Sequence, residues 1–212
     1  MNESDNNTAV QKGKGQRRAR ISMLLVLGLF ALPMTLAVLV ITLFPDWKPD
    51  TTTNNGDLVQ PVRKLPAFQL QPLKGEPIDE TFLRGKWTIL YLAKGECDRA
   101  CVEQLYNIRQ IRLTQGKNID RLRRLMLWSD EGVSDAKRQE LQTHFPGQVI
   151  APAGDKAALL QAFSLDEQDP LTANRIYLVD PLGFLMMKYD PGEKPQGMIK
   201  DLEKLLKYSG LG

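Results

Sequence analysis

An uncharged run of 24 residues, from Ile21 to Phe44, constrains this chain more than any other feature of its sequence. As a helix the run would be about 36 Å long, and the hydrocarbon core of a bilayer is about 30 Å thick. A cleaved signal peptide has a shorter apolar region followed by a small-residue cleavage site, whereas this run continues into Pro45-Asp46-Trp47. We therefore expect residues 21–44 to form one uncleaved transmembrane anchor.

The charges around this run predict its orientation. Residues 1–20 hold five basic and two acidic side chains, and Lys48 is the one cation just after the run. By the positive-inside rule, residues 1–20 form a cytoplasmic basic tail and the main domain is periplasmic, at a bacterial inner membrane. The rest of the chain is balanced in charge, which argues against nucleic-acid binding because that function needs a basic surface.

The segment after the anchor has the pattern of a linker followed by a folded domain. Residues 45–64 are rich in Pro, Thr, Asn and Gly and have no apolar period, so we expect a flexible linker. Residues 65–212 alternate between short apolar runs and amphipathic stretches. The runs predict strands at 87–92, 124–128, 148–151, 175–179 and 184–189, and helices at 98–114, 134–144, 156–163 and 196–208. This order predicts an α/β thioredoxin-like sandwich with helices on both faces of the sheet.

The two cysteines of the chain, Cys97 and Cys101, lie four positions apart where the first core strand should give way to a helix. One helical turn separates them, so their sulfurs can approach closely enough for a disulfide. The N–H groups at a helix N-terminus stabilise a thiolate. The pair is thus a candidate reactive site.

Three interpretations of the pair remain open. A redox-active dithiol would use Cys97 as the attacking thiolate and Cys101 to resolve the mixed disulfide. A pair of soft ligands would bind Cu(I). A static disulfide is natural outside the cytoplasm, but a disulfide that closes so short a loop adds little stability.

The sequence also excludes one class of metal site. Because His144 is the one histidine and the chain has two cysteines, a zinc site with four Cys/His ligands cannot form within one chain.

Residues 85–101, GKWTILYLAKGECDRAC, resemble the strand, loop and CxxxC motif of the Sco/SenC family. Residues 65–70 and 175–183 resemble the family's entry strand and its late strand and turn. The resemblance implies a membrane-anchored thioredoxin-like protein of cytochrome c oxidase assembly, with copper or thiol chemistry at Cys97 and Cys101. It also implies a partner that is a terminal oxidase subunit or another copper or thiol assembly factor.

The sequence departs from the family pattern at two places. Asp98-Arg99-Ala100 separates the cysteines, where the family usually has Pro-Asp. The family's third copper ligand is a histidine that would fall near Thr172, and residues 171–174 contain no histidine. We expect His144 to lie at the end of another helix. The main hypothesis is therefore a thiol–disulfide oxidoreductase of oxidase assembly. The alternatives are a Cu(I) chaperone that uses both cysteines and a non-catalytic assembly scaffold with a structural disulfide.

Overall fold

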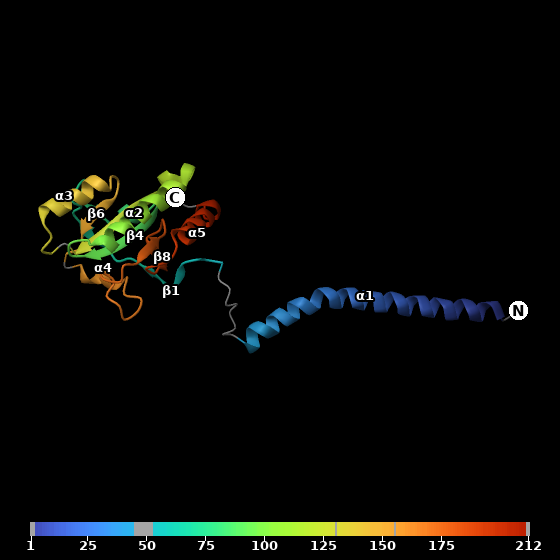
Figure 1. Cartoon of the computed structure of the whole chain (residues 1–212). Helices are drawn as coiled ribbons and strands as arrows, with labels where there is room; N and C mark the ends of the chain where they lie inside the picture. The colour runs from blue at the N-terminus through green and yellow to red at the C-terminus, as the bar shows by residue number, and fades with distance from the viewer. Residues whose placement is uncertain (1–2, 45–52, 130, 155, 211–212) are drawn as a thin grey trace. The chain divides into compact units, whose positions relative to one another are not determined.

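The computed structural model describes residues 3–44, 53–129, 131–154 and 156–210. The chain divides into two compact units, Met1–Thr52 and Thr53–Gly212. The first unit contains helix α1 (Glu3–Leu43; Figure 1). Its part from Arg20 to Leu43 contains an 18-residue stretch with a mean hydropathy of 2.7 and is long and apolar enough to cross a membrane. The predicted N-terminal apolar helix is present.

The second unit is built on a sheet of six strands in the order β1-β8-β7-β4-β5-β6. Strands β4, β5 and β6 are parallel, and β7, β8 and β1 continue the sheet in antiparallel pairs. The six strands are β1 (Asp57–Lys64), β4 (Trp87–Lys94), β5 (Leu122–Ser129), β6 (Val149–Pro152), β7 (Ile176–Val179) and β8 (Phe184–Tyr189). A separate two-stranded sheet pairs β2 (Gln69–Leu70) with β3 (Ile78–Asp79).

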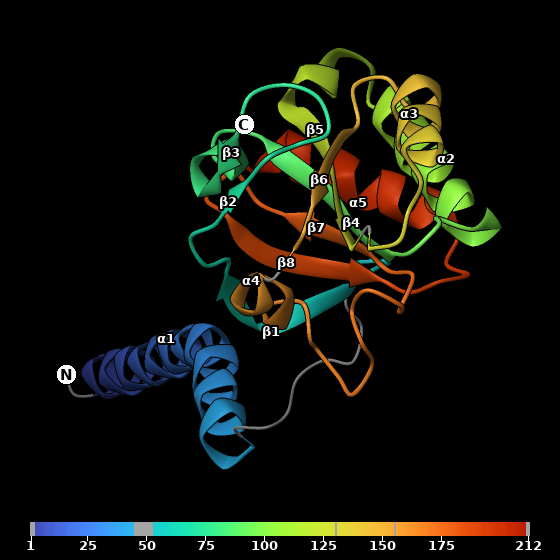
Figure 2. The ribbon, with the colours of Figure 1, turned by 90° about the vertical axis from the view of Figure 1, so that its left-hand side faces the viewer.

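Helices cover both faces of the sheet (Figure 2). Because side chains alternate along a strand, Ile89 and Leu90 of β4 enter different core clusters. The cluster around Ile89 includes residues of α2 (Arg99–Thr114), α3 (Asp135–His144) and α5 (Pro195–Tyr208). The cluster around Leu90 includes residues of η1 (Glu80–Leu83) and α4 (Ala157–Gln161). A short η2 (Gly116–Arg121) leads from α2 to β5. This arrangement, with helices on both faces of one sheet, agrees with the predicted α/β sandwich.

The predicted linker is wrong at its C-terminal end. Residues 57–64 form β1, which pairs antiparallel with β8. Sequence periodicity missed this strand because it is an edge strand with one fully buried residue, Val59, and because Pro61 interrupts it. Residues 45–52 of the expected linker lie outside the described residues.

A buried carboxylate attaches the start of the second unit to its last helix. Asp201 of α5 is 2% exposed, and its two oxygens accept hydrogen bonds from the backbone N–H groups of Asn55 and Gly56 at 2.9 to 3.1 Å. The Asn55 amide (2.9 Å) and the Tyr189 hydroxyl (3.2 Å) also donate to it. A Cβ at Gly56 would clash with the Tyr189 ring, so a glycine is required there. We call these contacts the Asp201 clamp.

Candidate functional site

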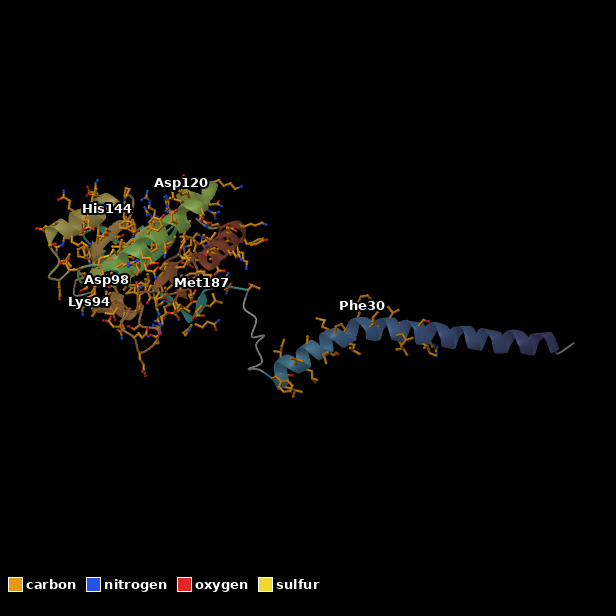
Figure 3. The ribbon with its side chains drawn as sticks, in the orientation of Figure 1. Phe30, Lys94, Asp98, Asp120, His144 and Met187 are labelled. Atoms are coloured by element: carbon orange, nitrogen blue, oxygen red, sulfur yellow. A yellow bond between two sulfur atoms is a disulfide. The ribbon has the colours of Figure 1, made fainter. Side chains whose placement is uncertain are left out.

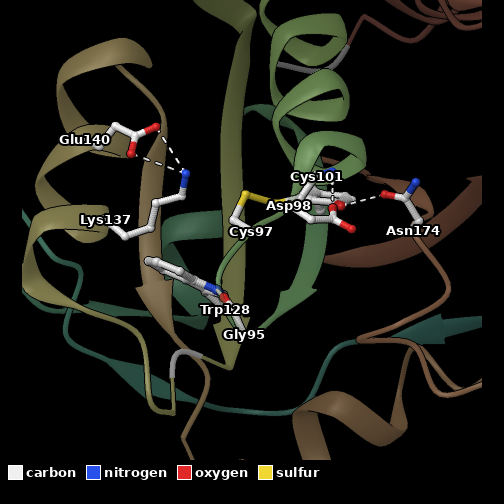
Figure 4. The surroundings of a disulfide bond; sticks show 9 residues. Gly95, Cys97, Asp98, Cys101, Trp128, Lys137, Glu140 and Asn174 are labelled. Atoms are coloured by element: carbon white, nitrogen blue, oxygen red, sulfur yellow. Dashed lines mark hydrogen bonds and ion pairs between the residues drawn. A yellow bond between two sulfur atoms is a disulfide. The ribbon is translucent and has the colours of Figure 1, made fainter.

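Cys97 and Cys101 form a disulfide at the point where β4 gives way to α2 (Figure 4). Their Cα atoms are 5.1 Å apart. Cys97 lies in the loop before the helix, and Cys101 lies in its first turn. The two residues are 3% and 5% exposed. The structure thus brings the two predicted site residues together as a bonded pair.

Hydrogen bonds to neighbouring elements shape the loop that carries Cys97. Gly95 adopts a left-handed φ of 68°. Its N–H donates to the carbonyl of Ser129 at 2.8 Å, and its own carbonyl accepts from the Trp128 indole at 2.8 Å. Cys97 has a φ of 48°, a conformation that is uncommon for a residue with a Cβ. The loop is therefore anchored on β5, which fixes the approach of Cys97 to the helix.

Asp98 caps the N-terminus of α2. Its side-chain oxygen accepts a hydrogen bond from the backbone N–H of Cys101 at 3.0 Å. An aspartate cap satisfies one of the free N–H groups of a first turn and complements the positive end of the helix dipole. The same positive end would stabilise a thiolate after reduction of the disulfide. The carboxylate of Asp98 acts against that effect, because a nearby negative charge raises a thiol pKa.

A cavity of about 380 Å³ opens beside the disulfide. Both cysteines line it, together with Tyr91 of β4 and with Thr172 and Asn174 from the loop before β7. The Tyr91 hydroxyl donates to the Asn174 side-chain oxygen at 2.6 Å. Burial, with a smaller contribution from Asp98, raises the pKa of Tyr91, so this hydroxyl is protonated at neutral pH. The hydrogen bond from Tyr91 to Asn174 thus connects β4 to the loop before β7, which form two walls of the cavity.

Sequence reasoning did not identify Tyr91 and Asn174 as site residues. Tyr91 is a polar-tipped residue among the aliphatic residues 89–93, which is a weak signal for a hydroxyl with a specific partner. Asn174 has a φ of 52°, a conformation that asparagine tolerates better than most residues. The backbone carbonyl of Asn174 also accepts a hydrogen bond from the side-chain amide of Gln104, on α2, at 3.3 Å. These contacts depend on long-range pairing, which the sequence does not display.

A buried arginine holds the loop that forms the second wall. Arg175 is 5% exposed, and its Nη1 and Nη2 contact the two oxygens of Asp166 at 3.0 and 2.6 Å. Its Nε also contacts Asp190, at the end of β8. The hydrogen bonds from Arg175 hold the pKa of Asp166 down at about 2. This network fixes residues 166–175 against the sheet next to the cavity.

A comparison with protein-family models shows the family to which the chain belongs. Residues 87–209 match the model described as the transmembrane-like, thioredoxin-like, C-terminal domain. The chain belongs to this family. The predicted thioredoxin-like fold is thereby confirmed. No curated protein matches the chain.

Solved structures of Sco and thioredoxin-like proteins share the fold of this member of the transmembrane-like, thioredoxin-like family. Copper-bound ScoI of Bradyrhizobium japonicum is 20% identical with a TM-score of 0.53, and the match covers 67% of this chain and 99% of that one. A Sco-family cytochrome c oxidase assembly protein, BsSco, with a disulfide switch, is 13% identical with a TM-score of 0.54, over 68% and 94%. The thioredoxin domain of a Bacteroides vulgatus thiol-disulfide oxidoreductase is 16% identical with a TM-score of 0.51, over 68% and 96%. The resemblance to Sco/SenC proteins is thus confirmed for the fold.

The donor set around the disulfide does not fit a three-ligand copper centre. Thr172 lines the cavity at the position where the resemblance places a histidine. His144 is the last residue of α3 and is exposed, as expected, and Figure 3 shows it away from Asp98. Within the described residues, no group of three or more His, Cys, Asp or Glu side chains could hold a metal ion. At this cavity the chain offers two cysteine sulfurs, which suit Cu(I) once the disulfide is reduced.

Proposed function

We propose that this chain is a membrane-anchored thiol–disulfide exchange protein that acts on the metal-ligand cysteines of a partner during cytochrome c oxidase assembly. The observation that carries the proposal is the Cys97–Cys101 disulfide, which lines an open cavity at the N-terminus of α2. Two proteins that share this fold support the proposal: BsSco, which has a disulfide switch, and the thiol-disulfide oxidoreductase of B. vulgatus. The partner is an oxidase subunit or another copper or thiol assembly factor.

The exchange proceeds in two balanced steps when the chain acts as a reductant. The Cys97 thiolate attacks one sulfur of a partner disulfide, and the other partner sulfur leaves as a thiolate. The Cys101 thiolate then attacks the Cys97 sulfur of the mixed disulfide and releases the second partner thiolate. The partner gains two electrons, the Cys97–Cys101 disulfide is restored, and water supplies the protons. A dithiol of another redox protein must reduce the pair before each cycle.

The test is to trap the mixed disulfide in cells. A full-length Cys101→Ser variant retains the attacking thiol but cannot resolve the intermediate, so it should accumulate a covalent adduct with its partner. Mass spectrometry of non-reduced samples identifies the partner peptide and its cysteine. The control is the double variant Cys97→Ser/Cys101→Ser, which should give no adduct. If the single variant gives none either, the exchange function is refuted.

A redox titration separates this function from a scaffold with a structural disulfide. Stable structural disulfides have potentials below about −300 mV, whereas labile catalytic ones lie above that value. Equilibration of the full chain with dithiothreitol mixtures, followed by alkylation, measures the potential. A value above the limit supports exchange, and a value below it supports the scaffold.

Delivery of Cu(I) is the second candidate function. It is favoured by the two cysteines on one cavity wall and by the copper bound in ScoI of B. japonicum. In this function the cysteines would hold the ion as cargo and the partner would supply a further ligand. An anaerobic Cu(I) titration of the reduced full chain measures its stoichiometry. Copper binding without any exchange with thiols would reverse the order of the two functions.

We also propose that α1 anchors the domain to a bacterial inner membrane, with residues 1–20 in the cytoplasm and the main domain in the periplasm. The apolar part of α1 and the excess of basic residues before it support this topology. A reporter fused after Gly212 should be active only if it functions in the periplasm. Activity of a cytoplasm-only reporter there would refute the orientation.

A further inference from the structure

A second cavity extends the one beside the disulfide. Its volume is about 450 Å³, and it shares the lining residues Ala100 and Asn174 with the first. Its walls are the second turn of α2, including Glu103 and Gln104, and residues 191–195, which lead into the first residue of α5. The two cavities therefore adjoin and form one groove with the disulfide at one end. We call it the α2 groove.

The charged side chains that line the α2 groove are mainly acidic. Lys94, Glu96 and Asp98 line the cavity at the disulfide, and Glu103, Glu193 and Lys194 line the adjoining cavity. Four carboxylates thus face two ammonium groups. All six residues are exposed, so their charges act on an approaching partner. Since the chain outside residues 1–20 is balanced in charge, this excess of two carboxylates is a local property of the groove.

The groove has the length of a short peptide segment. Glu103 of α2 lies five positions beyond Asp98, the residue that caps this helix, which corresponds to a rise of about 7.5 Å along the helix axis. An extended peptide covers that distance in two or three residues, at about 3.3 Å per residue. A segment whose cysteine lies at the disulfide would therefore place the side chain two or three residues away near Glu103.

We infer that the α2 groove binds an extended polypeptide segment that carries a cysteine with a lysine or arginine two or three residues from it. This inference rests on the proposed exchange function and names the substrate class of the same site. Carboxylates along the groove attract such a segment, raise its rate of encounter with Cys97 and discriminate against acidic segments. The attraction weakens as salt screens the charges.

The test compares three synthetic peptides that differ in charge alone. Each has one cysteine, in a mixed disulfide with 5-thio-2-nitrobenzoate, and carries lysine, glutamine or glutamate three residues away on both sides. The full chain with Cys101→Ser, in neutral detergent, attacks the peptide sulfur through the Cys97 thiolate. One S–S bond forms to the peptide, one breaks, and the nitrobenzoate thiolate leaves with a measurable colour. The fully reduced wild-type chain is measured in parallel, in case the variant folds poorly.

At low salt we expect the lysine peptide to react about tenfold faster than the glutamate peptide, with the glutamine peptide between them. The preference should shrink at high salt and in Glu103→Gln/Glu193→Gln. Glutamine at position 193 keeps a side-chain oxygen that can accept the hydrogen bond from the Asp190 N–H, which is 3.0 Å long in the wild type. The matched control is Glu203→Gln, on the exposed part of α5 outside the groove, which should keep the full preference.

The outcomes separate this inference from the proposed function. Equal rates for all three peptides, or a lysine preference that survives in the double variant, would overturn the groove's specificity while exchange stands. If no peptide releases the coloured thiolate from either form of the chain, exchange at Cys97 fails, and the inference fails with it.

Discussion

Replacement of Asp201 by alanine should destabilise the second unit strongly, because one carboxylate accepts every hydrogen bond of the Asp201 clamp. A hydrogen bond to a charged group contributes about 1.5 to 3 kcal/mol, and bonds that converge on one acceptor are not additive. When the segment detaches, the N–H groups of Asn55 and Gly56 can bond to water. The Tyr189 hydroxyl loses its carboxylate acceptor and keeps the Met187 sulfur, a weak acceptor at 3.7 Å, as its remaining partner. We therefore expect a loss of about 3 kcal/mol in the free energy of unfolding, and a fall of about 6–12 °C in Tm.

Urea unfolding of the full chain in detergent measures this loss by tryptophan fluorescence. Trp87 and Trp128 are 2% and 0% exposed, so their emission reports the packing of the sheet. The matched control is Glu203→Ala, two positions along the same helix and exposed to solvent. It should change stability by less than about 0.5 kcal/mol. If Asp201→Ala behaves like this control, the clamp contributes no stability and the reasoning is wrong.

Three further predictions concern the site and the loop beside it. Tyr91→Phe should lower the free energy of unfolding by about 0.5 to 1.5 kcal/mol and alter the rate of thiol exchange, because one wall of the cavity loses its hydrogen bond to the other; urea unfolding and exchange assays measure both. The hydrogen bond from Arg175 lowers the pKa of Asp166 to about 2 in the folded chain, so its stabilisation is present above about pH 4 and is lost as pH falls toward 2. Asp166→Asn should remove this part of the pH dependence of the unfolding midpoint. Thr172→His should raise copper affinity and His144→Ala should leave it unchanged, as anaerobic titrations of the reduced chain with Cu(I) and Cu(II) would show; tight Cu(II) binding by the wild type that His144→Ala abolishes would contradict both expectations.

The core strands and helices were predictable because their signals are local. Trp87 to Ala93 is an unbroken run of buried residues, as in a central strand covered on both faces. In α2, Cys101, Leu105, Ile108 and Ile111 are buried at helical spacing. Each pattern is complete within one segment, so the predicted bounds agree with the observed ones to within a few residues.

The edge strand and the second wall of the cavity were not predictable in the same way. β1 is held by backbone pairing with β8, more than a hundred residues later in the sequence, and backbone bonds leave no apolar period. The bond from Tyr91 to Asn174 joins residues 83 positions apart. In the sequence, Tyr91 is compatible with an ordinary strand and Asn174 with an ordinary loop. Their role in the cavity follows from the tertiary structure, which places them in contact.

The reach of Cys97 to Cys101 and the ability of α1 to span a membrane follow from the sequence, because each depends on the number of residues in one short segment. The shape and charge of the α2 groove depend on the fold, because its walls come from β4, from α2 and from two loops that are distant in the sequence. Whether the carboxylates of Glu103 and Glu193 act together is decided by packing of the sheet and helices, since electrostatic forces depend on distance in space and not on position along the chain.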